Sequence, residues 1–146
     1  MPARDQGQIP HENGPSSLGP RLAFMGSMQQ ADLKDRTMRL ALRVAALCRT
    51  LENDWAQRRV ADQLFRSATS VAANYHAATR ARSSREFLAK LGLVVEEAEE
   101  TVFWLDFAAR AGMADARSLP LATEAREVLA IFVASHKTVA AKLKRS

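Results

Sequence analysis

Four glutamates stand close together in the second half of the sequence, at Glu96, Glu97, Glu99 and Glu100. Carboxylates gathered on a helix are candidate metal ligands, because di-iron four-helix proteins use a Glu on two helices and Glu-x-x-His on the other two. The sequence has no Glu-x-x-His, and its histidines are His11, His76 and His136. We therefore expect no metal. Glu96, Glu97 and Glu100 should face away from the apolar stripe of their helix, and Glu99 should flank it. The group should form a solvated or interfacial acidic face, whose carboxylates can accept Arg66 or an arginine of a neighbouring subunit.

A second polar set combines one arginine with small polar side chains, at Arg66, Ser67, Ser70 and Asn74. On a helix the last three lie on one stripe, with Arg66 one step around it. One interpretation is structural, with small side chains that set helix register, and the other is a ligand or nucleic-acid contact. Nucleophilic catalysis has little support, because only His76 has a spacing that would bring an imidazole near the serines. Without a glycine-rich phosphate loop or a zinc pattern, we expect no enzyme activity, no cofactor and no small-molecule substrate.

Positive charge collects in one part of the chain. Seven basic and two acidic side chains lie between Arg58 and Lys90, whereas Leu91 to Asp106 holds five acids and no base. The C-terminal segment is basic again. The candidate phosphate contacts are Arg80, Arg82, Arg85, Lys90, Lys142, Lys144 and Arg145. Such cations can bind nucleic-acid backbones without reading the sequence. The alternative is that they are ordinary solvated side chains.

Large apolar residues also lie off the expected core stripe. One stripe, at spacings of three and four, consists of Leu93, Glu97, Glu100, Trp104 and Phe107. Exposed Trp and Phe side chains often anchor protein interfaces. The candidate oligomer contacts are therefore Leu93, Glu97, Trp104 and Phe107. The alternative is that the core-facing arc of this helix is wider than a narrow stripe.

The elements that would position these residues are helices. Gly and Pro are scarce after the first fifteen residues, and apolar residues recur every three or four positions. The predicted helices cover residues 31–51, 57–82, 84–110 and 118 onward, with Ser84 capping the third and Gly112 ending it. The expected core stripe of the third helix is Leu88, Leu91, Val95, Ala98, Val102 and Leu105. Short connections then predict an all-α, antiparallel up-down-up-down four-helix bundle. The turn at residues 80–85 and the C-terminal segment would share one end of it.

The rest of the chain gives simpler expectations. Residues 1–29 are polar and rich in Gly, Pro, Gln and Ser, so we expect a disordered tail ahead of a single bundle domain at 30–146. Met25 or Met28 is expected to be the natural start. Cys48 lies in an apolar stretch and is expected in the core. No apolar run approaches the roughly 20 residues needed to cross a bilayer, so no membrane association and a cytoplasmic location are expected.

Three stretches carry a family resemblance: Arg66-Ser-Ala-Thr-Ser-Val-Ala-Ala-Asn74, Glu86-Phe-Leu-Ala-Lys-Leu91 and Val95-Glu-Glu-Ala-Glu-Glu100. Together they resemble the four helix bundle protein family, also called the 23S rRNA intervening-sequence protein family, over about residues 30 to 144. The family pattern is matched at Arg66, Ser67, Ser70, Val71, Asn74, Phe87, Leu91 and Glu100. The resemblance therefore makes Glu100 the best ion-pair candidate among the four glutamates. After the Asn, many members continue Ile-Ala-Glu-Gly. Here the chain reads Tyr75-His-Ala-Ala, so no role of that glutamate carries over.

The resemblance implies a bundle that assembles into a homo-oligomer, with a pentameric ring known among family members. Some members are encoded within rRNA intervening sequences. A similar protein is the nucleic-acid-binding accessory of reverse transcriptases in diversity-generating retroelements. No reaction is implied. Together with the charge pattern, this predicts an oligomeric, non-catalytic adaptor that binds RNA or DNA backbone without sequence preference. The alternative is a protein-interaction scaffold with no nucleic-acid role.

Overall fold

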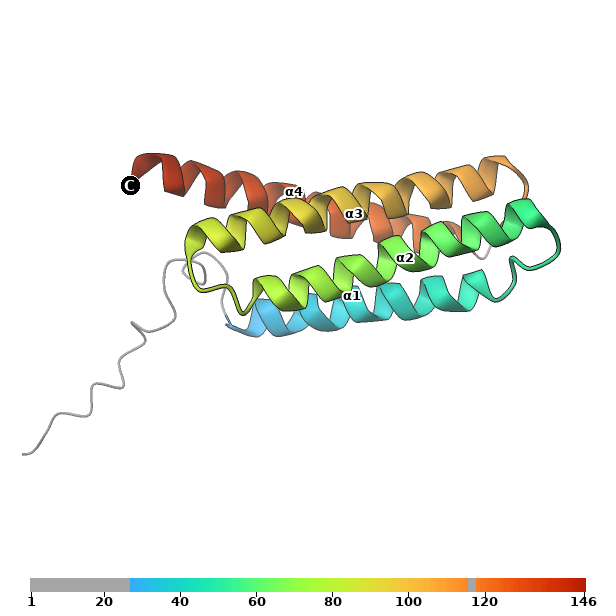
Figure 1. Cartoon of the computed structure of the whole chain (residues 1–146), viewed down its shortest axis with the longest axis horizontal. Coiled ribbons are helices and arrows are strands. Elements are labelled where there is room, and N and C mark those ends of the chain that lie inside the picture. Colours follow the sequence, from blue (N-terminus) through green and yellow to red (C-terminus); the bar gives the residue numbers. More distant parts are fainter. Residues whose placement is uncertain (1–26, 116–117) are drawn as a thin grey trace, which may run out of the picture.

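Four long helices make up the computed structural model, which describes residues 27–115 and 118–146 (Figure 1). They are α1 (Ser27–Cys48), α2 (Trp55–Ala78), α3 (Ser84–Arg110) and α4 (Leu119–Arg145). Successive helices run in opposite directions, so the predicted antiparallel up-down-up-down bundle is confirmed (Figure 1). No β-strand occurs within the described residues, and no helix among them is long and apolar enough to cross a membrane.

The first helix is displaced from its predicted bounds. It begins at Ser27 rather than at Ala31, and it ends at Cys48 rather than at Leu51. Leu51 is nevertheless fully buried, because the connection folds it under the end of the bundle. The tail expected at residues 1–29 falls outside the described residues, except for its last three positions, which belong to α1.

Side-chain caps define where α2 and α3 begin. The carboxylate of Asp54 accepts a hydrogen bond from the backbone N–H of Gln57 at 2.9 Å. The hydroxyl of Ser83 accepts from the backbone N–H of Glu86 at 3.1 Å, and the Glu86 carboxylate accepts from the N–H of Arg82 at 3.0 Å. The first two bonds satisfy helix N–H groups that have no partner within their own helix, and the third fixes the residue before the N-cap of α3. The N-cap of α3 is thus Ser83, and the prediction of Ser84 was wrong by one residue.

The end of α3 follows the predicted glycine. Gly112 has a φ of +69°, in the left-handed region that costs a glycine nothing. The backbone N–H of Met113 then reaches the carbonyl of Ala108 at 2.9 Å, which is the return bond of a Schellman motif. The chain therefore leaves α3 sharply and can start α4 beside it.

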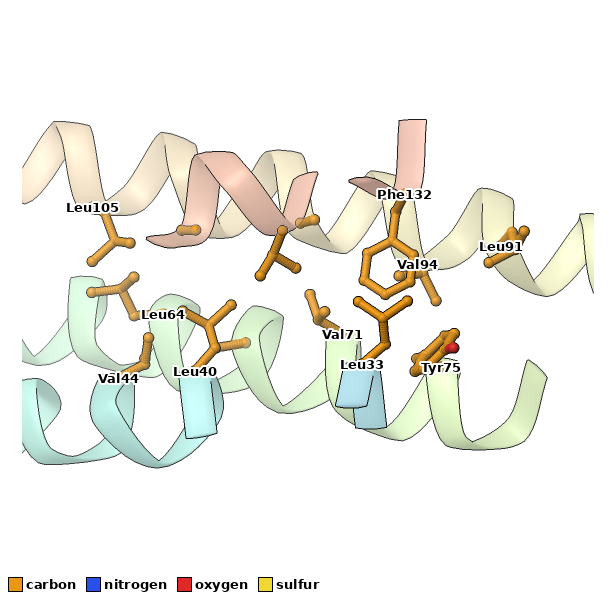
Figure 2. Packing of buried hydrophobic residues seen from close by; sticks show 14 of the residues in the cluster. Leu33, Leu40, Val44, Leu64, Val71, Tyr75, Leu91, Val94, Leu105 and Phe132 are labelled. Carbon is orange, nitrogen blue, oxygen red and sulfur yellow. The ribbon is translucent and has the colours of Figure 1, made fainter. Parts of the chain in front are cut away.

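Apolar side chains from all four helices meet along the bundle axis (Figure 2). In α3 the buried positions are Phe87, Leu91, Val94, Ala98, Thr101, Leu105 and Ala108. The expected stripe placed Leu88, Val95 and Val102 at the centre, but these three are only half-buried at its edge. In this register Thr101 occupies a core position, where its hydroxyl donates to the carbonyl of Glu97 at 2.8 Å. A threonine satisfied by its own helix can be buried at low cost.

The four helix interfaces are unequal. α2 and α3 share the most extensive contact, α1 packs on α2 and α3 packs on α4 to similar degrees, and α1 meets α4 least. We call the line between α1 and α4 the α1/α4 seam. The arginine Arg36 of α1 bridges it, with its Nε 2.5 Å from Glu124 and its Nη2 2.7 Å from Glu127. Ion pairs therefore supplement sparse apolar packing along the α1/α4 seam.

Tyr75 carries a polar group that is buried without a partner. Its ring is fully buried against Phe132, with ring centroids 4.9 Å apart (Figure 2). Its hydroxyl has no hydrogen-bond partner among the described residues. Burial also raises the pKa of this phenol, because the charged form cannot be solvated there.

We expect the Tyr75→Phe variant to be more stable than the wild type. The change removes a buried, unpaired hydroxyl and keeps the ring, so the free energy of unfolding should rise by about 1 kcal/mol. Denaturant unfolding followed by circular dichroism measures this. Tyr75→Leu serves as the control, because it also loses the ring packing and should destabilise the protein. A clear loss of stability in Tyr75→Phe would mean that a water molecule or another group binds the hydroxyl.

Candidate functional site

The predicted ion pair between Arg66 and Glu100 is present, and it joins α2 to α3. The Arg66 guanidinium contacts the Glu100 carboxylate through Nη2, and its Nη1 lies 3.2 Å from Glu97. Hydrogen bonding and charge from Arg66 hold the pKa of Glu100 below its usual range, while Glu100 and Glu97 raise the pKa of Arg66. The arginine side chain is 47% exposed, so the free-energy gain is about 1 kcal/mol or less. This cluster joins α2 to α3 and leaves both carboxylates engaged.

The rest of the Arg66 motif lies between α2 and α3 or in the core. Ser67 is fully buried, and its hydroxyl donates to the carbonyl of Leu64 at 3.2 Å. Phe87 is fully buried in the core. Ser70 and Asn74 are half-buried, and neither side chain has a hydrogen-bond partner within the described chain. The packing of Ser67 and Phe87 favours the structural interpretation of the motif, although the polar side chains of the motif form no hydrogen bonds to one another.

An exposed apolar patch covers the outside of α3. Leu93 is 47%, Phe103 56% and Phe107 43% exposed, whereas Trp104 is half-buried against the edge of the core. The three aromatic rings contact one another, with centroids 5.0 to 6.3 Å apart. We call Leu93, Phe103, Trp104 and Phe107 the α3 outer face. The core arc of α3 thus widens to include Trp104, whereas Leu93, Phe103 and Phe107 face outward, and their role as oligomer contacts stays a prediction.

Trp104 links the α3 outer face to the Arg66 cluster. Its indole N–H is buried and forms no hydrogen bond within the described chain. It nevertheless lies close enough to Glu100 to help lower the pKa of that carboxyl. Trp104 therefore lies where the α3 outer face borders the Arg66 cluster.

The remaining glutamates divide differently from the prediction. Glu97 and Glu100 do not face away from the bundle but lie half-buried at the boundary with α2. Glu99 does not flank the core and is exposed, as is Glu96. The buried face of α3 is rotated by a fraction of a turn from the predicted one. Each glutamate therefore points in a different direction from the one expected. Glu96 and Glu99 have no ion-pair partner among the described residues.

The basic candidates lie together at one end of the bundle. The connection between α2 and α3 and the last turns of α4 meet at the same end (Figure 1). We call the following set the basic end: Arg80, Arg82, Arg85, Lys90, Lys142, Lys144 and Arg145. All of them are exposed except Lys90, which is half-buried. Arg80, Arg82 and Arg85 form no ion pair within the described part of the chain, so their charges are directed at solvent.

Some functional candidates gave no signal in the sequence. The bridge from Arg36 to Glu124 and Glu127 joins residues about ninety positions apart, and no local spacing marks it.

Cys48 is half-buried, and its thiol donates to the carbonyl of Ala61 at 3.3 Å. Burial raises the pKa of this thiol to about 11, which makes it a poor nucleophile. Among the described residues, no group of His, Cys, Asp and Glu side chains is placed to hold a metal ion.

Comparison with known proteins agrees with this architecture. A family model described as 23S rRNA-intervening sequence protein matches residues 29–134. A crystal structure of a protein of unknown function from the S23 ribosomal protein family of Bacteroides thetaiotaomicron is similar to the bundle, with a TM-score of 0.68 and 27% sequence identity. That similarity covers 74% of this chain and 97% of the other. No curated protein matches the chain.

Proposed function

Because the chain belongs to the 23S rRNA-intervening sequence protein family, we propose that it is a non-catalytic, self-associating adaptor that binds nucleic-acid backbone through its basic end. The family name points to RNA as the relevant chemistry. The candidate residues of this chain offer ion pairs, apolar contact and phosphate contacts. These are binding interactions, and none of them makes or breaks a bond.

The observation that carries the proposal is the position of the arginines around the start of α3. Lysine and arginine in the last turn of α4 would complement the helix dipole in any protein. Arg85, however, lies in the first turn of α3, and Arg82 directly precedes its N-cap. Cations are unfavourable at a helix N-terminus by a few tenths of a kcal/mol to about 1 kcal/mol. Helix stability therefore does not account for these arginines, whereas an anionic partner at this end does.

Self-association is supported by the α3 outer face. Contiguous exposed aromatic side chains on a small protein usually mark a contact surface, and Phe and Trp are enriched at such surfaces. In an oligomer the basic end would repeat around the assembly and multiply the phosphate contacts of one chain. The five-fold ring known in the family is the stoichiometry to test first.

A binding titration at several salt concentrations tests the nucleic-acid role. We expect a fluorescent structured RNA and a duplex DNA of similar length to bind at 50 mM salt, with little preference for sequence. The logarithm of the affinity should fall linearly with the logarithm of the salt concentration, by about 0.7 to 0.9 for each phosphate contacted. Absence of binding at low salt, or an affinity that salt leaves unchanged, would refute the role.

A second function, that of a protein-interaction scaffold, is favoured by the same α3 outer face. This function requires no nucleic acid, so it predicts no binding in the salt titration, whereas the first proposal predicts salt-dependent binding. A chain that self-associates but fails to bind either nucleic acid would establish the scaffold function instead.

A further inference from the structure

The α1/α4 seam is hollowed along much of its length. Three adjoining cavities of about 490, 130 and 450 Å³ follow it, the first two sharing Arg36 and the last two sharing Arg43. Leu33, Leu40 and Leu47 line them in turn at intervals of seven residues, which places one leucine in each. The result is a groove with an apolar floor beside the least extensive of the helix interfaces, and the ion pair between Arg36 and Glu124 crosses it between the first two cavities.

The middle of this groove carries unpaired positive charge, whereas the acidic residues Asp32 and Asp115 line its two ends. Arg36, Arg39 and Arg43 lie on the side of α1 that borders the groove. Arg36 is paired with Glu124 and Glu127 of α4. Arg39 and Arg43 are exposed and have no ion-pair partner within the described residues. Arg36 pairs with carboxylates on a helix that runs beside α1. Arg39 and Arg43 could pair in the same way with carboxylates on a second helix that lies along the groove.

The chain itself carries such a helix surface. Exposed Phe103 on the α3 outer face is preceded by Glu99 one turn earlier and by Glu96 two turns earlier. Both glutamates are exposed and unpaired within the described chain, whereas Glu97 and Glu100 are already held by Arg66. The α3 outer face is therefore apolar and locally acidic, and the groove is apolar and locally basic. An amphipathic helix face with apolar anchors is the usual occupant of such a groove.

We infer that the α3 outer face of one copy docks into the α1/α4 groove of a second copy, with Glu96 and Glu99 opposite Arg39 and Arg43. This rests on the self-association in the proposed function and names the two surfaces that meet. The surfaces lie on different helices of the same chain, so the contact is head-to-tail and each copy uses both. Contacts of this kind generate rings when the rotation closes and open chains when it does not.

Charge reversal on each surface, separately and together, tests the pairing. We expect wild-type protein to show an oligomeric mass in light scattering coupled to size exclusion. The groove variant Arg39→Glu/Arg43→Glu and the face variant Glu96→Arg/Glu99→Arg should each fall toward the mass of the 16.1 kDa chain. The chain with all four substitutions restores opposite charges across the contact, and its mass should return to that of the wild type.

A matched control isolates the groove from net charge. Arg49→Glu/Arg59→Glu makes the same change in charge at exposed positions outside the groove and should keep the oligomeric mass. All six positions are exposed, so helix content by circular dichroism should stay at the wild-type level. A monomeric wild type would refute self-association itself. An oligomeric wild type whose groove variant keeps its mass, or a four-fold variant that stays monomeric, would refute this pairing and leave self-association standing.

Discussion

Replacing Phe132 by alanine is expected to destabilise the protein by about 3 to 5 kcal/mol. Phe132 is fully buried on α4 and packs against Tyr75 of α2, so it spans the bundle diagonally (Figure 2). The loss combines the transfer free energy of the ring with the cavity that it leaves. A small domain has only about 5 to 15 kcal/mol of stability, so the variant should be close to unfolding at moderate temperature. Urea titration followed by circular dichroism measures the change.

Phe103→Ala is the control for this experiment. It removes the same number of atoms from a side chain that is 56% exposed, so the free energy of unfolding should change by about 0.5 kcal/mol or less. Both variants should be measured at low protein concentration, because Phe103 belongs to the proposed contact between copies. Equal losses for the two variants would contradict the assignment of core and surface on α3 and α4.

Removing the three arginines around the start of α3 should abolish most of the binding to nucleic acid. In the Arg80→Gln/Arg82→Gln/Arg85→Gln variant, up to three phosphate contacts per chain are lost. The slope of log affinity against log salt should then fall by up to about 3 for each chain in contact. The fold should persist, because a cation leaves the N-terminus of α3 and the Ser83 cap is untouched. The titration described above measures the slope.

A variant of equal charge separates this local effect from general electrostatics. Arg49→Gln/Arg59→Gln/Arg110→Gln removes three exposed arginines that lie outside the basic end. We expect its salt slope to stay near that of the wild type. If both triple variants weaken binding equally, net charge accounts for the affinity and the basic end is not a site.

The number, order and direction of the helices could be predicted because chain breakers are scarce between the turns. Gly112 marks the end of α3 by a conformation that few other residues adopt, and this was readable from the sequence. The exact core register was not readable, because apolar residues occur in adjacent pairs such as Val94 and Val95. The observed register buries Thr101, a polar residue that a hydrophobic pattern places outside the core, and its hydroxyl is satisfied within its own helix.

A candidate surface could be predicted when its residues lie close together in the sequence. The basic end came from a run of arginines and a topology rule, and Arg66 with Glu100 came from a family motif. The α1/α4 groove could not be foreseen, because it depends on how sparsely two helices from opposite ends of the sequence pack. The charges of Arg39 and Arg43 have meaning only beside that groove.

The unequal helix interfaces also bear on how the chain reaches this structure. The most extensive contact joins α2 and α3, which are separated only by a short turn, and the sparsest joins the helices most distant in sequence. Short loops cost little entropy to close, and proteins dominated by local contacts fold within microseconds to milliseconds. The α2–α3 hairpin can therefore act as the nucleus on which α1 and α4 settle independently. We therefore expect the groove between them, which needs both helices in place, to form after the α2–α3 hairpin that carries the aromatic face.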